Sequence, residues 1–154
     1  MSHRRRGKAI IFNHYRFDPK QQLKPRTGTD TDRDNLRVCL RQLDFEVEVY
    51  NDLPVKEIDK VLEDVALEDH SDADCILIAC LSHGELGILY ASDHAYKPDK
   101  LWAPFNSEAC PSLAGKPKLF FIQVSNNLGI TILVYTSISK VKSKTPSLSA
   151  KKPC

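Results

Sequence analysis

The last third of the sequence lacks acidic residues: no Asp or Glu follows Glu108, although seven lysines do. This part therefore carries a formal charge of +7, whereas the 15 basic and 20 acidic residues up to Glu108 give −5. The net charge of +2 conceals two segments of opposite sign, and this shift sets the chain from Ala109 onward apart from the rest. Lysines without interleaved aromatic residues are typical of a solvated chain end, so we expect no nucleic-acid partner.

Long apolar runs are also absent. No run of 18 apolar residues occurs, which excludes the usual transmembrane helix, and no apolar secretory core follows the basic start Met1–Gly7. The 154 residues, 42% of them apolar, suit one domain with a core of its own. We therefore expect a cytoplasmic protein without a membrane partner.

Paired cysteine motifs are missing as well, because the five cysteines include no CxxC pair. Cys39, Cys75 and Cys80 fall within apolar patterns, which predicts buried free thiols in a reducing cytosol. A zinc site of Cys75, Cys80 and His83 could be drawn on paper. However, two strand residues separated by an odd number point to opposite faces. We therefore expect no metal and no cofactor.

The most informative stretch present is Asp74–Gly87. Seven of the eight residues of Cys75–Ser82 are apolar or cysteine, which predicts a strand buried on both faces. His83 would then lie just past the carboxyl end of this strand, where open α/β sheets bind ligands, and Gly84 would leave its N–H accessible. A proton-transfer base and an oxyanion donor are two of the three parts needed to hydrolyse an acyl bond. A structural histidine at a turn is the alternative.

The remaining periodicity indicates alternating strands and helices. It predicts strands over 8–13, 46–50 and 119–123, helices over 29–43 and 54–65, a hairpin over 88–96, and one or two helical turns over 99–105. The first helix would begin with a Thr29–Asp32 capping box and bury Leu36, Cys39, Leu40 and Leu43. This order favours an α/β fold with a mostly parallel sheet flanked by helices. Neighbouring parallel strands would bring His83 and Gln123 to one edge of the sheet.

Six segments, in this order, resemble the large subunit of caspases, and most closely of executioner caspases. They are Ile10–His14, Arg26–Asp30 with Asn35-Leu36, Leu43–Val47, Asp69–Asp72, Leu81–Glu85 and Cys110–Gln123. The last two segments are highly specific, and together the six lie within about three quarters of the chain.

The resemblance implies a caspase-like fold and the site of a cysteine-type, aspartate-specific endopeptidase linked to apoptosis. It implies that His83 is the catalytic histidine and that Gly84 supplies an amide of the oxyanion hole. It further implies that Arg26 and Gln123 line the pocket for the substrate's aspartate. An arginine fork suits this task because it holds a carboxylate by paired, charge-assisted hydrogen bonds.

The sequence departs from the caspase pattern directly after Gln123. The family continues with Ala-Cys-Arg-Gly or a close variant, whereas this chain has Val124–Gly129, with Ser125 at the position of the nucleophilic cysteine. A serine hydroxyl needs strong base assistance, whereas a cysteine is partly thiolate near neutral pH. We expect this substitution alone to lower the rate by orders of magnitude.

No caspase small subunit is recognisable after this point, so we expect only the large-subunit half, without the dimer interface. The expected organisation is a basic tail over 1–7, a large-subunit domain over 8–123, and an unrelated, disordered basic tail over 124–154. Within that tail, the run Ile130–Ile138 could form one strand. Leu119–Ile122 would lie at an open sheet edge. Val-Ser-Asn can be encoded by a splice-donor sequence, so the tail is either read-through of an unspliced intron or a true divergent end.

Three functions follow from these features. The first is a large-subunit domain that is inactive by itself. The second is a decoy or regulator that binds a full-length caspase through its open edge. The third is a weak hydrolase that uses Ser125 and His83. The partners expected are protein substrates or a full-length caspase.

Overall fold

The computed structural model describes residues 2–138 and 147–151. Its main sheet has the order β2-β1-β3-β6-β7-β8, with β1, β2, β3 and β6 parallel and β7 and β8 antiparallel to their neighbours. The strands are β1 Gly7–Asn13, β2 Phe45–Asn51, β3 Ile76–Glu85, β4 Ile88–Tyr90, β5 Ala95–Tyr96, β6 Lys118–Asn126, β7 Gly129–Ser137 and β8 Ser147–Lys151. The helices are α1 Thr29–Gln42, α2 Val55–Leu67 and α3 Asp99–Trp102, with short 3-10 turns η1 Pro19–Gln21, η2 Ala103–Phe105 and η3 Pro111–Leu113.

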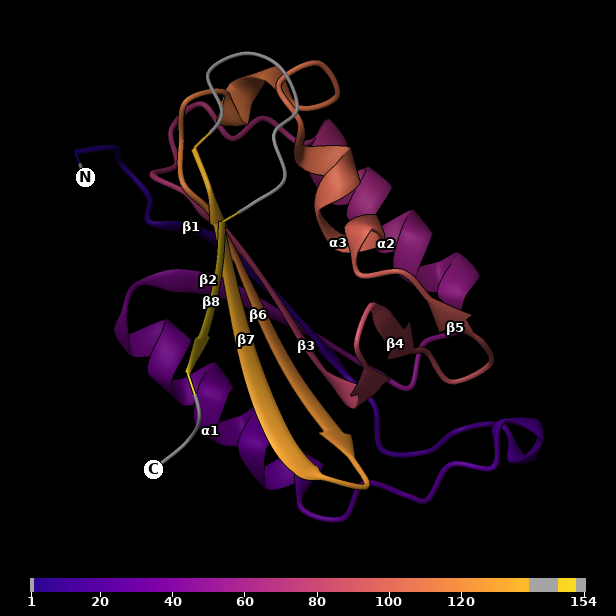
Figure 1. Ribbon diagram of the computed structural model, residues 1–154. Helices are drawn as coiled ribbons and strands as arrows, with labels where there is room; N and C mark the ends of the chain where they lie inside the picture. The colour runs from indigo at the N-terminus through magenta and orange to yellow at the C-terminus, as the bar shows by residue number, and fades with distance from the viewer. Residues whose placement is uncertain (1, 139–146, 152–154) are drawn as a thin grey trace.

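Helices cover both faces of the sheet, as Figure 1 shows, with α1 on one face and α2 and α3 on the other. The two apolar clusters follow from strand alternation, since successive side chains point to opposite faces. The cluster on the α2 face includes Phe12, Ile78, Phe120, Ile58 and Leu101. The cluster on the α1 face includes Ile11, Ala79, Leu77, Leu36 and Leu40. The predicted α/β architecture is therefore present.

The beginning of α1 differs from the prediction. Gly28, with a φ of 90°, caps the helix, and no side chain makes a capping hydrogen bond. The Thr29 hydroxyl instead donates to Asn13 Oδ1 at 2.7 Å and accepts from Arg26 Nη1 at 2.6 Å. The capping-box prediction is wrong because these buried partners already use the Thr29 hydroxyl.

The buried face of α1 is also narrower than predicted. Leu36 and Leu40 contact the sheet, whereas Cys39 is exposed and Leu43 is 54% exposed. The helix α1 therefore packs on the sheet through one narrow row of side chains, and the positions beside that row face solvent. Cys75 and Cys80 are buried in the clusters on opposite faces, as the odd separation of the two residues predicts.

The carboxyl end of the chain is more ordered than predicted. After Asn126 the chain turns through Asn127 and Leu128, and β7 then pairs with β6 along its whole length. The prediction of disorder is wrong for 124–137 and 147–151, and 139–146 and 152–154 lie outside the described residues. The prediction of an open edge at Leu119–Ile122 is also wrong because β7 covers it. The strand predicted over Ile130–Ile138 corresponds to β7.

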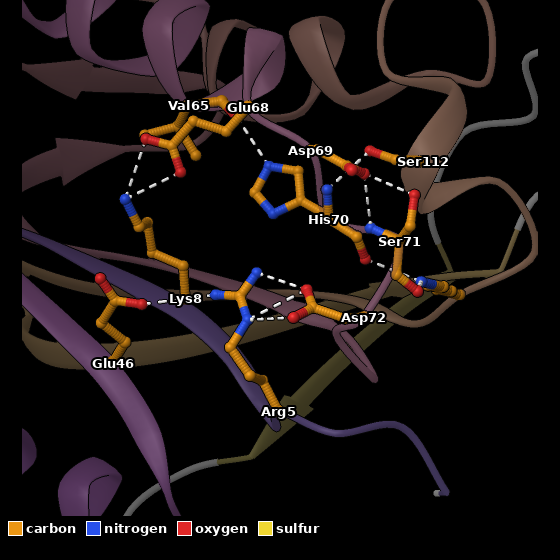
Figure 2. A network of polar contacts seen from close by, with 11 residues as sticks. Arg5, Lys8, Glu46, Val65, Glu68, Asp69, His70, Ser71, Asp72 and Ser112 are labelled. Atoms are coloured by element: carbon orange, nitrogen blue, oxygen red, sulfur yellow. Dashed lines mark hydrogen bonds and ion pairs between the residues drawn. The ribbon is translucent and has the colours of Figure 1, made fainter.

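Ion pairs hold the amino-terminal edge of the parallel strands together. Figure 2 shows Arg5 with its Nη2 atom 2.7 Å from Asp72 Oδ1, and Lys8 with its Nζ atom 2.9 Å from Glu68. Nearby, His70 is buried and its Nε2 lies 2.7 Å from the Val65 carbonyl. Arg5 also forms a parallel bridge with Ala73. The basic segment predicted as a tail thus lies against the body of the protein.

Among residues 2–138 and 147–151, no helix has both the length and the apolar character needed to cross a membrane. No three His, Cys, Asp or Glu side chains among them converge as a metal site would require.

Candidate active site

The five residues singled out from the sequence lie together at the carboxyl ends of the parallel strands. His83 on β3 and Ser125 on β6 are direct neighbours in the parallel ladder, and Gln123 lies opposite Leu81. Arg26 comes from the long segment between β1 and α1, which Figure 1 shows in indigo extending beyond the sheet. Its guanidinium lies 3.0 Å from Ser125 Oγ and 3.1 Å from Gln123 Oε1.

His83 lies within β3 rather than beyond its end. The strand continues to Glu85 because β4 pairs with it there, with Gly84 opposite Leu89 and Glu85 opposite Ile88. The prediction that His83 lies just past the carboxyl end of this strand is therefore wrong. The imidazole remains partly accessible, and its ring centroid lies 5.0 Å from that of Phe17.

The contacts of the His83 ring determine which nitrogen can take up a proton. Its Nε2 lies 2.7 Å from the Lys24 carbonyl, which can only accept, so Nε2 carries a hydrogen. In the neutral ring, Nδ1 is then bare and can accept from the Ser125 hydroxyl at 3.1 Å. A charged ring would instead donate from Nδ1 to the Ser125 carbonyl at 3.0 Å. Either way, His83 is oriented to exchange a proton with a group at position 125.

Arg26 is the buried cation of the site, with 7% of its surface exposed. Nη1 donates inward to the His14 carbonyl at 3.2 Å and to the Thr29 hydroxyl. Burial lowers the pKa of Arg26, but a guanidinium stays charged at physiological pH. Gln123 is fixed in turn, since its Nε2 donates to Asp32 Oδ2 at 3.2 Å while its Oε1 faces Arg26.

His14 is a buried neighbour of Arg26 that was not singled out from the sequence. Its side chain is fully buried, and neither ring nitrogen has a hydrogen-bond partner among the described residues. Burial lowers the pKa of His14 to about 4, and the charge of Arg26 acts in the same direction against the opposing charge of Asp52. The His14 imidazole is therefore held neutral, chiefly by burial and further by the charge of Arg26, which disfavours a second cation.

Gly84 has a packing reason to be glycine. A Cβ atom there would lie 2.5 Å from Val124 Cγ1 and 2.9 Å from the Ile88 carbonyl oxygen. These contacts are too close for a side chain, so the Val124 side chain and the Ile88 carbonyl can lie this near to residue 84 only because it is glycine. Close packing is therefore an alternative explanation for glycine at position 84, beside the oxyanion-hole role that the resemblance implies.

An open cleft of about 620 Å³ begins at His83 and Ser125. Two of its leucines, Leu86 and Leu128, are almost completely exposed, at 103% and 98%. The lining residues are Gln22, Leu23, Lys24, His83, Gly84, Glu85, Leu86, Tyr90, Ser125, Asn126, Asn127 and Leu128. Arg26 and Gln123 are not among them, so the guanidinium lies beside the cleft rather than within it.

Comparison with known proteins identifies the family that this geometry represents. The family model described as Caspase domain matches residues 6–151. The chain belongs to the caspase family. It is 58% identical over 123 residues to Caspase-1 of Spodoptera frugiperda and 55% identical over 123 residues to Caspase drICE of Drosophila melanogaster. Each match covers 80% of this chain but only 41% and 36% of the two relatives.

The caspase fold is confirmed by solved structures. The crystal structure of Caspase-1 from Spodoptera frugiperda matches with a TM-score of 0.78 and 57% identity, over 80% of this chain and 49% of that one. The structure titled pro-sf-caspase-1 matches with a TM-score of 0.80 and 55% identity, over 82% of this chain and 54% of that one. The chain thus spans about half or less of the length of these caspases. The match corresponds to the predicted large-subunit half, a mostly parallel sheet flanked by helices.

Residue type alone could not have revealed every part of this caspase site. Lys24 acts through its backbone carbonyl, which carries no side-chain signal, and Thr29 was assigned to a helix cap. The one available signal for His14 was its place in the Ile10–His14 segment, directly after the strand predicted over 8–13.

Proposed function

We propose that this chain is a caspase large-subunit domain that binds aspartate side chains through Arg26 and Gln123 but does not cleave peptides by itself. The observation that carries the proposal is the Ser125 hydroxyl, whose Oγ lies 3.1 Å from His83 Nδ1, at the sequence position where the resemblance implies a cysteine nucleophile. The proposed setting is cytoplasmic proteolysis in apoptosis, with aspartate-containing proteins as partners. The proposed organisation keeps the large-subunit domain at 8–123, between a basic segment 1–7 and an unrelated basic segment 124–154.

The chemistry supports binding over turnover. Arg26 is a buried fork that rejects uncharged side chains, because an unsuitable ligand would leave its charge unpaired. His83 can accept a proton from position 125, and Gly84 is the proposed source of an oxyanion N–H. However, a serine hydroxyl has a far higher pKa than a thiol and needs a site shaped to activate it. Arg26 Nε points at the Ser125 oxygen, and this contact engages a lone pair that a nucleophile would use.

The test is an assay of the purified chain with a peptide substrate whose scissile bond follows Asp. We expect no turnover above that of a His83→Ala control. Cleavage after Asp that depends on His83 would overturn the proposal.

A weak serine hydrolase is the second candidate, and the 3.1 Å contact between Ser125 Oγ and His83 Nδ1 is the observation in its favour. If this candidate is correct, the parent chain cleaves after Asp and Ser125→Ala removes the activity. A Ser71→Ala variant is the matched control, because Ser71 (labelled in Figure 2) is exposed and precedes β3, whereas His83 lies near the carboxyl end of that strand.

A further inference from the structure

The contacts of Arg26 divide its guanidinium into two edges. Nη1 is directed into the protein, toward the His14 carbonyl and the Thr29 hydroxyl. Nε and Nη2 form the other edge and donate to Ser125 Oγ at 3.0 Å and Gln123 Oε1 at 3.1 Å. Four of the five N–H groups of Arg26 are therefore engaged by the described residues.

The Nε–Nη2 edge is one that an arginine uses to hold a carboxylate side-on, with one oxygen on each nitrogen. In this chain two side-chain oxygens of β6 already lie on that edge. Strand alternation explains why they come as a pair: residues 123 and 125 share a face, whereas Val124 points to the opposite one. Ser125 and Gln123 thus present to Arg26 an arrangement similar to the two oxygens of a bound carboxylate.

We propose that Ser125 is an internal ligand of Arg26 that competes with the carboxylate of an incoming aspartate. This inference rests on the proposed role of Arg26 and Gln123 as the aspartate pocket. It assigns to Ser125 the role of setting affinity and specificity, in place of nucleophilic attack. A carboxylate can reach Nε only by displacing the Ser125 hydroxyl, which then keeps His83 Nδ1 as its neighbour.

The inference predicts an increase in affinity when the hydroxyl is removed. A hydrogen bond to a charged group contributes more than one between neutral groups, so freeing Nε should tighten binding of an aspartate side chain about tenfold, which corresponds to about 1.4 kcal/mol. A catalytic or supporting role for Ser125 predicts the opposite sign or no change. The sign of the effect therefore separates the two roles.

The probe is N-acetyl-aspartate N-methylamide, and the neutral comparison is the corresponding asparagine compound. Binding is measured by NMR on the ¹⁵N-labelled full chain, using the Arg26 Nε–H resonance, which reports directly on the disputed hydrogen bond. We expect Ser125→Ala to bind the aspartate probe about tenfold more tightly than the parent. Ser125→Thr, which keeps a hydroxyl, and the distant Ser71→Ala should retain the parent's affinity.

Arg26→Lys keeps the charge but lacks the fork, and it separates failure of the inference from failure of the proposed function. Equal, weaker or undetectable binding by Ser125→Ala, while the parent's binding is lost in Arg26→Lys, would overturn the role of Ser125 and leave the aspartate pocket intact. Binding that survives in Arg26→Lys, or equal binding of the asparagine compound, would overturn both. If Ser125→Ala loses the dispersed spectrum of a folded chain, Ser125→Gly takes its place with the same expectations.

Discussion

Among single residues, Arg26 and His14 show how one buried site holds a charge and a neutral imidazole side by side. Arg26 keeps its charge because oxygen atoms surround the guanidinium on both edges. His14 has no such partners among the described residues, so burial favours its neutral form. Protonation of His14 would add a second positive charge, which the charge of Arg26 disfavours.

This arrangement predicts a loss of stability in mild acid. The pKa of His14 is lowered from 6.5 to about 4 in the folded chain, so between these values the unfolded state binds more protons. The contribution of neutral, buried His14 to the free energy of unfolding is fully present above about pH 6.5 and is lost as the pH falls toward 4. From about pH 7 to about pH 5, the free energy of unfolding should fall by about 2 kcal/mol through this residue.

Urea unfolding at these two pH values, in the parent and in His14→Leu, measures the effect. The variant should lose this part of the pH dependence, because it has no group to titrate there. His94→Gln is the control, since the His94 side chain is 78% exposed and pairs only with neighbouring Asp93 among the described residues. An identical pH dependence in the parent and His14→Leu would contradict the buried, neutral assignment.

Among single residues, the sequence allowed us to predict the site residues whose side-chain type matches a specific motif. His83, Arg26, Gln123 and Ser125 were placed correctly near one another because motif and strand order agree. The Lys24 carbonyl and the Arg26–Ser125 hydrogen bond depend on the path of an irregular segment, which no periodicity encodes.

Among the elements, β6 and β7 depart most from expectation. The apolar pattern and the β-propensity of the sequence predicted both strands. However, β-propensity does not determine which strand a segment pairs with. The turn at Asn127-Leu128 joins them directly, and nine consecutive pairs bind β7 to β6. A local hairpin has a small loop-closure cost, which explains how β7 can complete the sheet directly after β6.

The packing of β7 on the body gives a prediction for Tyr135. The Tyr135 ring lies 5.0 Å from that of Trp102, which in turn lies 5.7 Å from Phe120. Tyr135→Ala should lower the free energy of unfolding by about 1–2 kcal/mol, because the ring is only partly buried. Trp102 is the single tryptophan of the chain, so its fluorescence should shift to the red in the folded variant.

Tyr135→Phe keeps the ring and serves as the matched variant, with stability and emission close to those of the parent. Unchanged fluorescence and stability in Tyr135→Ala would mean that β7 does not pack on α3 in solution.

At the scale of the whole molecule, the order of the sheet bears on the proposed partners. Binding of a full-length caspase along β6 would need a free edge there, but β3 and β7 occupy its two sides. Among the described strands, the outermost ones are instead β2 and β8. The decoy hypothesis therefore loses the contact on which it was based.

We predict that a large excess of this chain leaves the turnover of a purified executioner caspase unchanged. The experiment mixes the two proteins at about tenfold molar excess and follows cleavage of an Asp-terminated peptide. A catalytically silent, unrelated protein of similar size is the control for crowding. A reduced rate, together with co-elution of the two chains, would contradict this prediction and support the decoy hypothesis.

The ion pairs at the amino-terminal edge have a practical consequence for handling the protein. Arg5 is fixed to Asp72, as Figure 2 shows, and His3 Nδ1 lies 2.9 Å from Asp74 Oδ1. The start of the chain therefore lies at the amino-terminal edge of the parallel strands, opposite His83 and Ser125. The seven residues of β1, at about 3.3 Å each, separate the two edges by roughly 23 Å. A sensor surface or bead attached at this end would therefore hold every molecule with its cleft facing the solution.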